Sequence, residues 1–362
     1  MTLERGEAKI RVLVVDDSAL MGRQITNILE NDDKIEVLGW AKDGLQALQM
    51  IRTLNPDVVT MDVEMPVMNG ITALKHVMVK HPIPTVMISA LTVEGSKTTF
   101  DALKYGAIDV IAKPSRREYV SLEAQEAEII AKVKRAASIR TGRSRYMRLS
   151  PKEQSEGSNS KRLAPGPATR FIGIGAGTGG YYGLLRIIPC LPADFQDVLI
   201  AVILVSSRYL DPFVSYLDAH SAVPVKKADG TSPIETGTCY LCSGDSGPFL
   251  EPKVNGNVRF SFRPRASHNN GAGAIDKLFE SCAQIAGRRA VGVIMTGPGR
   301  DGAEGLSQIR EAGGVSVIQD INNCVDPSMP LAVLEKGLVT KMLPDYMIAD
   351  FLTNGTTLDG EK

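Results

Sequence analysis

Short apolar runs alternate with amphipathic segments through the first part of the chain. The runs are typical of buried strands, and the segments between them have the apolar spacing of helices. The predicted strands are 10–15, 37–41, 57–61, 85–89 and 109–112, and the predicted helices are 18–29, 44–54, 68–80, 94–105 and 123–137. Ser18 is the expected N-cap of the first helix. Strands that alternate with helices predict a doubly wound parallel α/β sheet.

Charged and polar residues stand at the ends of four of these strands. They are Asp16 and Asp17, Asp62, Ser89 and Lys113. Because the carboxyl ends of parallel strands meet at one edge of an open sheet, we expect these side chains in one crevice. Three carboxylates repel one another unless a cation joins them, and hard oxygen ligands favour Mg²⁺. The pattern therefore predicts phosphoryl transfer onto Asp62, with its carboxylate as the nucleophile and with Mg²⁺ and Lys113 neutralising charge.

Four motifs at these positions resemble the receiver domain of two-component response regulators. They are Asp16-Asp17-Ser18, Met61-Asp62-Val63-Glu64-Met65-Pro66, Ser89-Ala90-Leu91 and Lys113-Pro114, and the resemblance covers Lys9 to Ala137. It implies a flavodoxin-like sheet and phosphorylation of Asp62 by a sensor histidine kinase in a phosphorelay. It also implies Mg²⁺ on Asp17, Asp62 and the Glu64 carbonyl beside Asp16, with switching through Ser89 and Lys113. The family often carries an aromatic residue where this chain has Val110.

Residues 138–170 lose the apolar periodicity. They begin with a basic stretch, continue with Ser, Gly and Pro, and contain one aromatic residue, Tyr146. This composition is typical of a flexible tether. Because aromatic rings that stack on bases are nearly absent and the formal net charge of the chain is zero, we predict no nucleic-acid partner. We expect a linker between two domains, 1–137 and 171–355.

The second half opens with an apolar run and then glycines, Gly175-Ala-Gly177-Thr-Gly-Gly180. The spacing satisfies G-x-G-x-x-G, in which backbone N–H groups at a helix start favour an anion. A dinucleotide site also needs an acid after the next strand. That strand, 198–205, is followed by Ser206-Ser207-Arg208. Nucleotide binding is therefore a minor hypothesis, and the preferred interpretation is a tight strand-to-helix turn that needs glycine.

Further strands at 290–295 and 315–319, with helices to about 311 and over 329–336, predict a second α/β domain. Several blocks resemble the catalytic domain of chemotaxis protein-glutamate methylesterases of the CheB type. They are Ile174–Gly180, Leu191–Phe195, Phe213–Asp218, Thr296–Ala303, Gln319-Asp320 and Met329-Pro330. A receiver, a linker and this domain form that family's architecture. The resemblance implies a chemotaxis response regulator that serves a CheA-like kinase and removes methyl or amide groups from glutamyl side chains of chemoreceptors, using Ser, His and Asp.

Two of those three catalytic positions depart from the family. The serine position, just before Thr-Gly-Gly, holds Gly177, and the histidine position after the next strand holds Leu204. Asp301 is retained, but its loop has Pro298 where methionine is usual. Glycine has no nucleophile and leucine accepts no proton. Our first hypothesis is a response regulator whose output domain lacks hydrolase activity and acts by binding.

The second hypothesis is an active methylesterase or glutamine deamidase with a relocated nucleophile. Thr178 is next to Gly177, Ser206 and Ser207 lie near the expected base, and His220 and His268 are the histidines of this half. Catalytic geometry tolerates little displacement, so this hypothesis is the weaker one.

Five cysteines are scattered, apart from Cys239 and Cys242. That spacing suits a zinc half-site or a redox pair, but no second pair or nearby histidine completes a tetrahedral site, and buried packing is the preferred interpretation. The odd cysteine number, the charged first residues and the absence of a long uncharged apolar run predict a cytoplasmic protein without membrane insertion.

Overall fold

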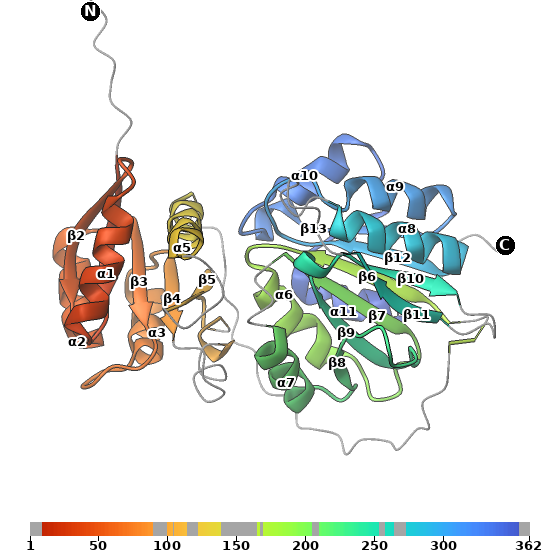
Figure 1. Cartoon of the computed structure of the whole chain (residues 1–362), viewed down its shortest axis with the longest axis horizontal. Helices are drawn as coiled ribbons and strands as arrows, with labels where there is room; N and C mark the ends of the chain where they lie inside the picture. Colours follow the sequence, from red (N-terminus) through yellow and green to blue (C-terminus); the bar gives the residue numbers. More distant parts are fainter. Residues whose placement is uncertain are drawn as a thin grey trace, which may run out of the picture. The chain divides into compact units, whose positions relative to one another are not determined.

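The chain forms two compact units, residues 1–148 and 149–362 (red to yellow and green to blue in Figure 1). The computed structural model describes residues 9–89, 100–103, 105–113, 122–138, 165–166, 169–204, 210–252, 258–263 and 273–354. Among the helices of these residues, none combines the length and apolar character needed to cross a bilayer.

The first unit contains a five-stranded parallel sheet in the order β2-β1-β3-β4-β5. Its strands are β1 Ile10–Val15, β2 Ile35–Ala41, β3 Val58–Asp62, β4 Thr85–Ser89 and β5 Asp109–Ala112. This order reverses direction between β1 and β3, and ligands of doubly wound sheets bind at such a reversal. The predicted doubly wound α/β sheet is confirmed.

The helices with defined bounds in this unit are α1 Ala19–Glu30, α2 Gly44–Leu54, α3 Gly70–Lys80 and α5 Leu122–Ala137. The first three of them begin at polar N-caps. Ser18, Asp43 and Asn69 accept backbone N–H bonds of 3.4, 2.8 and 2.9 Å at the starts of α1, α2 and α3. Each such cap stabilises a protein by about 1 kcal/mol. The Asn69 cap also explains why α3 begins two residues later than predicted. Of the helix expected at 94–105, residues 100–103 are described and helical.

The second unit contains a seven-stranded parallel sheet in the order β14-β13-β12-β6-β7-β9-β8. Its strands are β6 Phe171–Ala176, β7 Val198–Ile203, β8 Val225–Lys227, β9 Thr238–Ser243, β12 Ala290–Ile294, β13 Val315–Gln319 and β14 Lys341–Leu343. An antiparallel pair, β10 Pro248–Pro252 and β11 Val258–Phe262, stands apart from it. The sequence did not predict β8, β10, β11 and β14. Strands β8 and β14 have three residues each, which establish no period, and β10 begins and ends with proline, which is atypical of strands.

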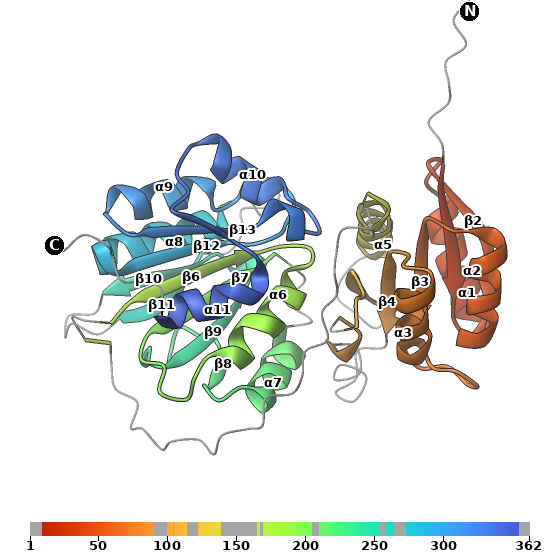
Figure 2. The same ribbon diagram turned by 180° about the vertical axis from the view of Figure 1, so that it is seen from behind.

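Helices cover both faces of this sheet (Figures 1 and 2). One face carries α8 Ala274–Ala286, α9 Ala303–Glu311 and α10 Ser328–Glu335, and the other carries α6 Gly180–Ile187, α7 Leu210–His220 and α11 Asp345–Asn354. Packing is tight beneath α8, where a Cβ at Gly173 would lie 2.8 Å from the Phe279 ring.

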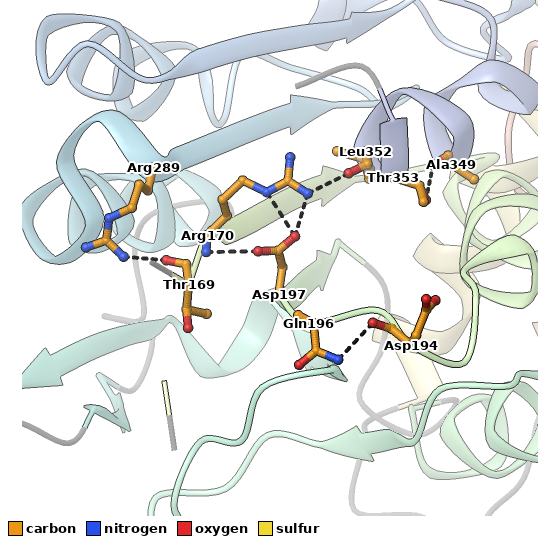
Figure 3. A network of polar contacts seen from close by, with 9 residues as sticks. All are labelled: Thr169, Arg170, Asp194, Gln196, Asp197, Arg289, Ala349, Leu352 and Thr353. Carbon is orange, nitrogen blue, oxygen red and sulfur yellow. Dashed lines mark hydrogen bonds and ion pairs between the residues drawn. The ribbon is translucent and has the colours of Figure 1, made fainter. Parts of the chain in front are cut away.

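Arg170, just before β6, forms an ion pair with Asp197, just before β7 (Figure 3). Asp197 accepts hydrogen bonds from the backbone N–H and from Nε of Arg170, at 3.0 and 2.9 Å. The same guanidinium donates to the Leu352 carbonyl at 2.8 Å. This network fixes the amino end of the sheet, opposite the carboxyl end at which β6 and β7 lead into Gly177 and Leu204.

Candidate functional site

The acidic site of the first unit lies where four strands end. Asp16 follows β1, Asp62 ends β3, Ser89 ends β4, and Lys113 follows β5. The register pairs Asp62 with Ile88 and Ser89 with Ala112, and the Lys113 N–H donates to the Ser89 carbonyl at 2.9 Å. These predicted residues therefore meet at one edge, at the reversal between β1 and β3.

Lys113 joins two buried carboxylates. Its Nζ lies 2.7 Å from Asp62 Oδ2 and 3.1 Å from Asp16 Oδ2. The site opens into a cavity of about 540 Å³ lined by Asp17, Asp62, Glu64, Met65, Pro66, Ser89 and Lys113. Asp62 is only 3% exposed, so its carboxylate lies at the floor of this cavity.

Burial raises the pKa of Asp62 to about 6, although the Lys113 ammonium opposes the shift. Burial by itself would lower the pKa of Lys113, but Asp62 and Asp16 outweigh it and the net shift is upward. Both shifts have one cause, a charged pair taken partly out of water. A further cation at the site would favour the ionised, nucleophilic form of Asp62.

The donor set fits a hard divalent cation. One oxygen each of Asp16, Asp17 and Asp62 can be chosen so that all lie within 4.8 Å of one another. Asp16 Oδ2 is buried and pairs with Lys113, but it accepts no hydrogen bond within the described part of the chain. Carboxylate oxygens with unused acceptor capacity are the ligands that Mg²⁺ prefers.

The backbone approaches the site closely at Gly70. A Cβ there would lie 1.9 Å from the Asp62 carbonyl oxygen. No side chain fits, so glycine at the start of α3 is required to hold the loop after Asp62 against β3.

The second unit brings its three triad positions to the carboxyl edge of its own sheet. The Gly177 N–H donates to the Thr296 carbonyl at 2.8 Å, and the Leu204 N–H donates to the Ala176 carbonyl at 2.7 Å. Asp301 lies in the loop between β12 and α9. Leu204 packs against the apolar core, and its Cδ2 would meet a Cβ on Gly244 at 2.6 Å.

Asp301 is engaged with the start of a helix. Its carboxylate accepts the N–H groups of Ile275 and Asp276 at 3.3 and 3.1 Å. Asp276 in turn accepts the Gly305 N–H of α9 at 2.7 Å. The N-caps of α8 and α9 are glycines without a capping side chain. Asp301, just before α9, therefore caps α8, and Asp276, in the first turn of α8, caps α9.

This reciprocal capping was not found from the sequence. The available signal was Asp276 in the first turn of α8, where a carboxylate favours free N–H groups. Burial raises the pKa of Asp301 to about 6, with Asp276 adding repulsion and the backbone N–H groups opposing both.

The described residues considered as replacements for the serine nucleophile and the histidine base are poorly placed for catalysis. Thr178 is 5% exposed, and its carbonyl accepts the Thr296 hydroxyl at 2.9 Å. His220 ends α7, stacks on Tyr216 and lies 2.7 Å from the Tyr216 carbonyl. Because α7 returns to the start of β8, His220 lies at the opposite end of the sheet from Gly177. Ser206, Ser207 and His268 lie outside the described residues.

Neighbouring side chains pack directly against the glycine-rich turn at residues 175–180. A Cβ at Gly175 would lie 2.5 Å from Ile275, and one at Gly179 would lie 2.7 Å from Val325. These contacts account for the glycines without a nucleotide, as the preferred sequence interpretation holds.

Cys239 and Cys242 are both buried on β9. Their odd spacing places them on opposite faces of the strand, which excludes joint binding of one metal ion. Burial raises the pKa of the Cys242 thiol, as expected for a packing role.

Comparison with known proteins gives two family matches that follow the two units. Residues 12–124 match the response regulator receiver domain, and residues 172–352 match CheB methylesterase. The fold and its sites thus define a response regulator with a methylesterase-type output unit. The chain belongs to the CheB methylesterase family.

Relatives named "Protein-glutamate methylesterase/protein-glutamine glutaminase" match over nearly the whole length. The protein of Pyrococcus abyssi is 39% identical, and the match covers 93% of this chain and 90% of the relative. The protein of Symbiobacterium thermophilum is 37% identical, with 97% and 98% covered. The protein of Thermotoga maritima is 35% identical, with 95% and 97% covered.

Proposed function

We propose that this chain is a phosphorylation-controlled response regulator whose output unit binds a signalling partner and does not hydrolyse esters. The observation that carries the proposal is the state of the triad positions. Residue 177 has no side chain, residue 204 is a core-packed leucine, and Asp301 caps α8. The sheet brings the three positions to one edge, but none of the three supplies a nucleophile or a base.

The receiver unit is proposed to accept a phosphoryl group from a sensor histidine kinase. An Asp62 carboxylate oxygen forms the bond to phosphorus, the phosphorus–nitrogen bond breaks, and the kinase imidazole leaves. Lys113 holds Asp62 from one side, and Ser89 lines the cavity beside it. Mg²⁺ would be held by Asp16, Asp17, Asp62 and the Glu64 carbonyl, and when bound it neutralises charge on the transferred group.

The partner of the output unit is proposed to be a chemoreceptor or a related signalling protein in the cytoplasm. The relatives are named for action on glutamate and glutamine of proteins, which supports a protein as the partner, and the match to CheB methylesterase favours the chemoreceptor class. Phosphorylation of Asp62 would then change the affinity of the output unit for that partner.

The test is a methanol-release assay on a methylated receptor fragment, with and without acetyl phosphate. We expect no release above the protein-free rate in either condition. Phosphorylated protein is expected to bind the fragment with a different affinity, and Asp62→Asn, which keeps the shape of the side chain, is the matched control that loses the difference. Appreciable release of methanol by the wild-type chain contradicts the proposal.

A second candidate is a retained methylesterase or glutaminase activity with a relocated nucleophile. The names of the relatives favour it, whereas the burial of Thr178 opposes it. If turnover is observed, Thr178→Ala and His268→Ala identify the groups. Turnover that neither change lowers rules out this route.

A further inference from the structure

The backbone at Gly177 is enclosed by the loop that precedes Asp301. A Cβ built on Gly177 would lie 2.7 Å from Gly297 Cα and 2.8 Å from Pro298 Cδ. Non-bonded carbon atoms sit comfortably at about 3.5–4.0 Å. Any side chain at position 177 therefore requires the segment 297–298 to move away.

Hydrogen bonds fix the segment 296–297 to other parts of the second unit. The Gly297 N–H donates to the Asp326 carbonyl at 2.9 Å, and the Gly297 carbonyl accepts the Met329 N–H at 3.0 Å. The Thr296 N–H donates to Gln319 Oε1 at 2.9 Å. Overpacking a site of this kind destabilises the fold, because the surrounding backbone cannot move without giving up these hydrogen bonds.

Pro298 adds a chemical obstacle to this steric one. Its ring replaces the backbone N–H, and the ring carbon Cδ attached to that nitrogen is the atom that faces position 177. Acyl transfer from residue 177 would place a developing oxyanion near this loop, and such an anion is stabilised by N–H donors fixed in advance. Residue 298 supplies none.

We propose that Pro298 is a positioning residue that keeps the output unit closed to acyl transfer even when a nucleophile and a base are put back at positions 177 and 204. This inference rests on the proposed function in one respect, that positions 177 and 204 lack the nucleophile and the base. It goes beyond that function because it identifies a third residue, outside the triad, that prevents acyl transfer.

The experiment uses the full chain and diisopropyl fluorophosphate, followed by intact mass. In the variant Gly177→Ser/Leu204→His, labelling would join the introduced hydroxyl oxygen to phosphorus, break the phosphorus–fluorine bond, release fluoride and pass the hydroxyl proton to the introduced imidazole. We expect this double variant to label no faster than wild type. Adding Pro298→Met or Pro298→Ala, which both restore the N–H, is expected to speed labelling at least about tenfold.

The proposal is overturned if the double variant labels as fast as the triple variants, or if folded triple variants do not label. Stability provides an independent test that needs no activity. Gly177→Ala is expected to lower the unfolding midpoint more in the Pro298 background than in the Pro298→Ala background, and equal losses would also overturn the proposal. Failure of the proposed function appears separately, as methanol release by the wild-type chain.

Discussion

The indole nitrogen of Trp40 donates a hydrogen bond of 2.8 Å to the backbone carbonyl of Asp16. Trp40 lies on β2 and is 36% exposed, whereas the Asp16 carboxylate lies in the acidic site beneath Lys113. The ring also fills the space beside Gly22, where a Cβ would approach Nε1 to 2.4 Å. One hydrogen bond thus connects the surface of β2 to the backbone of the proposed metal site.

Trp40 is the single tryptophan of the chain, so its fluorescence reports this site alone. We expect MgCl₂ to change the emission in a saturable way, because a cation on the carboxylates alters the field at the Asp16 carbonyl. Asp17→Asn, which removes one charge at the cavity, is expected to weaken the response. CaCl₂ and NaCl at equal ionic strength are the controls, and an emission that follows ionic strength alone contradicts the Mg²⁺ assignment.

Val67 carries strain beside the same cavity. Its φ is +64°, it is 82% exposed, and the Met68 N–H donates to the Pro66 carbonyl at 2.7 Å, which makes Val67 the centre of a γ-turn. A β-branched residue is unfavourable there, so Val67→Gly is expected to raise the free energy of unfolding by about 1 kcal/mol. Val79, equally exposed but helical, is the matched control: Val79→Gly is expected to lower it. Urea denaturation of both variants decides the sign.

Asp301 is expected to matter for stability without any catalytic role. Asp301→Ala leaves the N–H groups of Ile275 and Asp276 without their acceptor and should cost about 1–2 kcal/mol. Asp301→Asn keeps one acceptor oxygen and should cost less. Thermal and urea unfolding measure both changes. An Asp301→Ala variant as stable as wild type would show that the capping contributes nothing.

The pH dependence of stability has a defined sign at Asp301. Its pKa is raised from 3.8 to about 6 in the folded chain, so folding favours the protonated carboxyl. The stabilisation is present below about pH 4 and is lost as the pH rises through about 6, with an upper bound of about 3 kcal/mol. Because asparagine does not ionise, the stability of Asp301→Asn relative to wild type should increase from pH 4 to pH 7. A pH-independent difference argues against the shifted pKa.

The acidic site was predictable because the residues next to each of its members along the chain indicate its position. Asp16, Asp62, Ser89 and Lys113 each stand at the end of an apolar run, and parallel strands gather such ends at one edge. The helix starts at Ser18 and Asn69 carry equally local signals. The short strands β8 and β14 carry none, because three residues establish no period.

The sequence by itself determined the alternation of strands and helices, the position of Asp62 and the identity of the residues at 177 and 204, since these depend on neighbours along the chain. Only the tertiary structure decided that Pro298 closes on Gly177, that Asp301 and Asp276 cap each other's helices, and that Trp40 contacts Asp16. Each of these pairs joins separate elements of the structure. Their contacts depend on how segments that are distant along the chain pack together. Contacts of this kind arise from the buried interior as a whole and leave no periodic signal in the sequence.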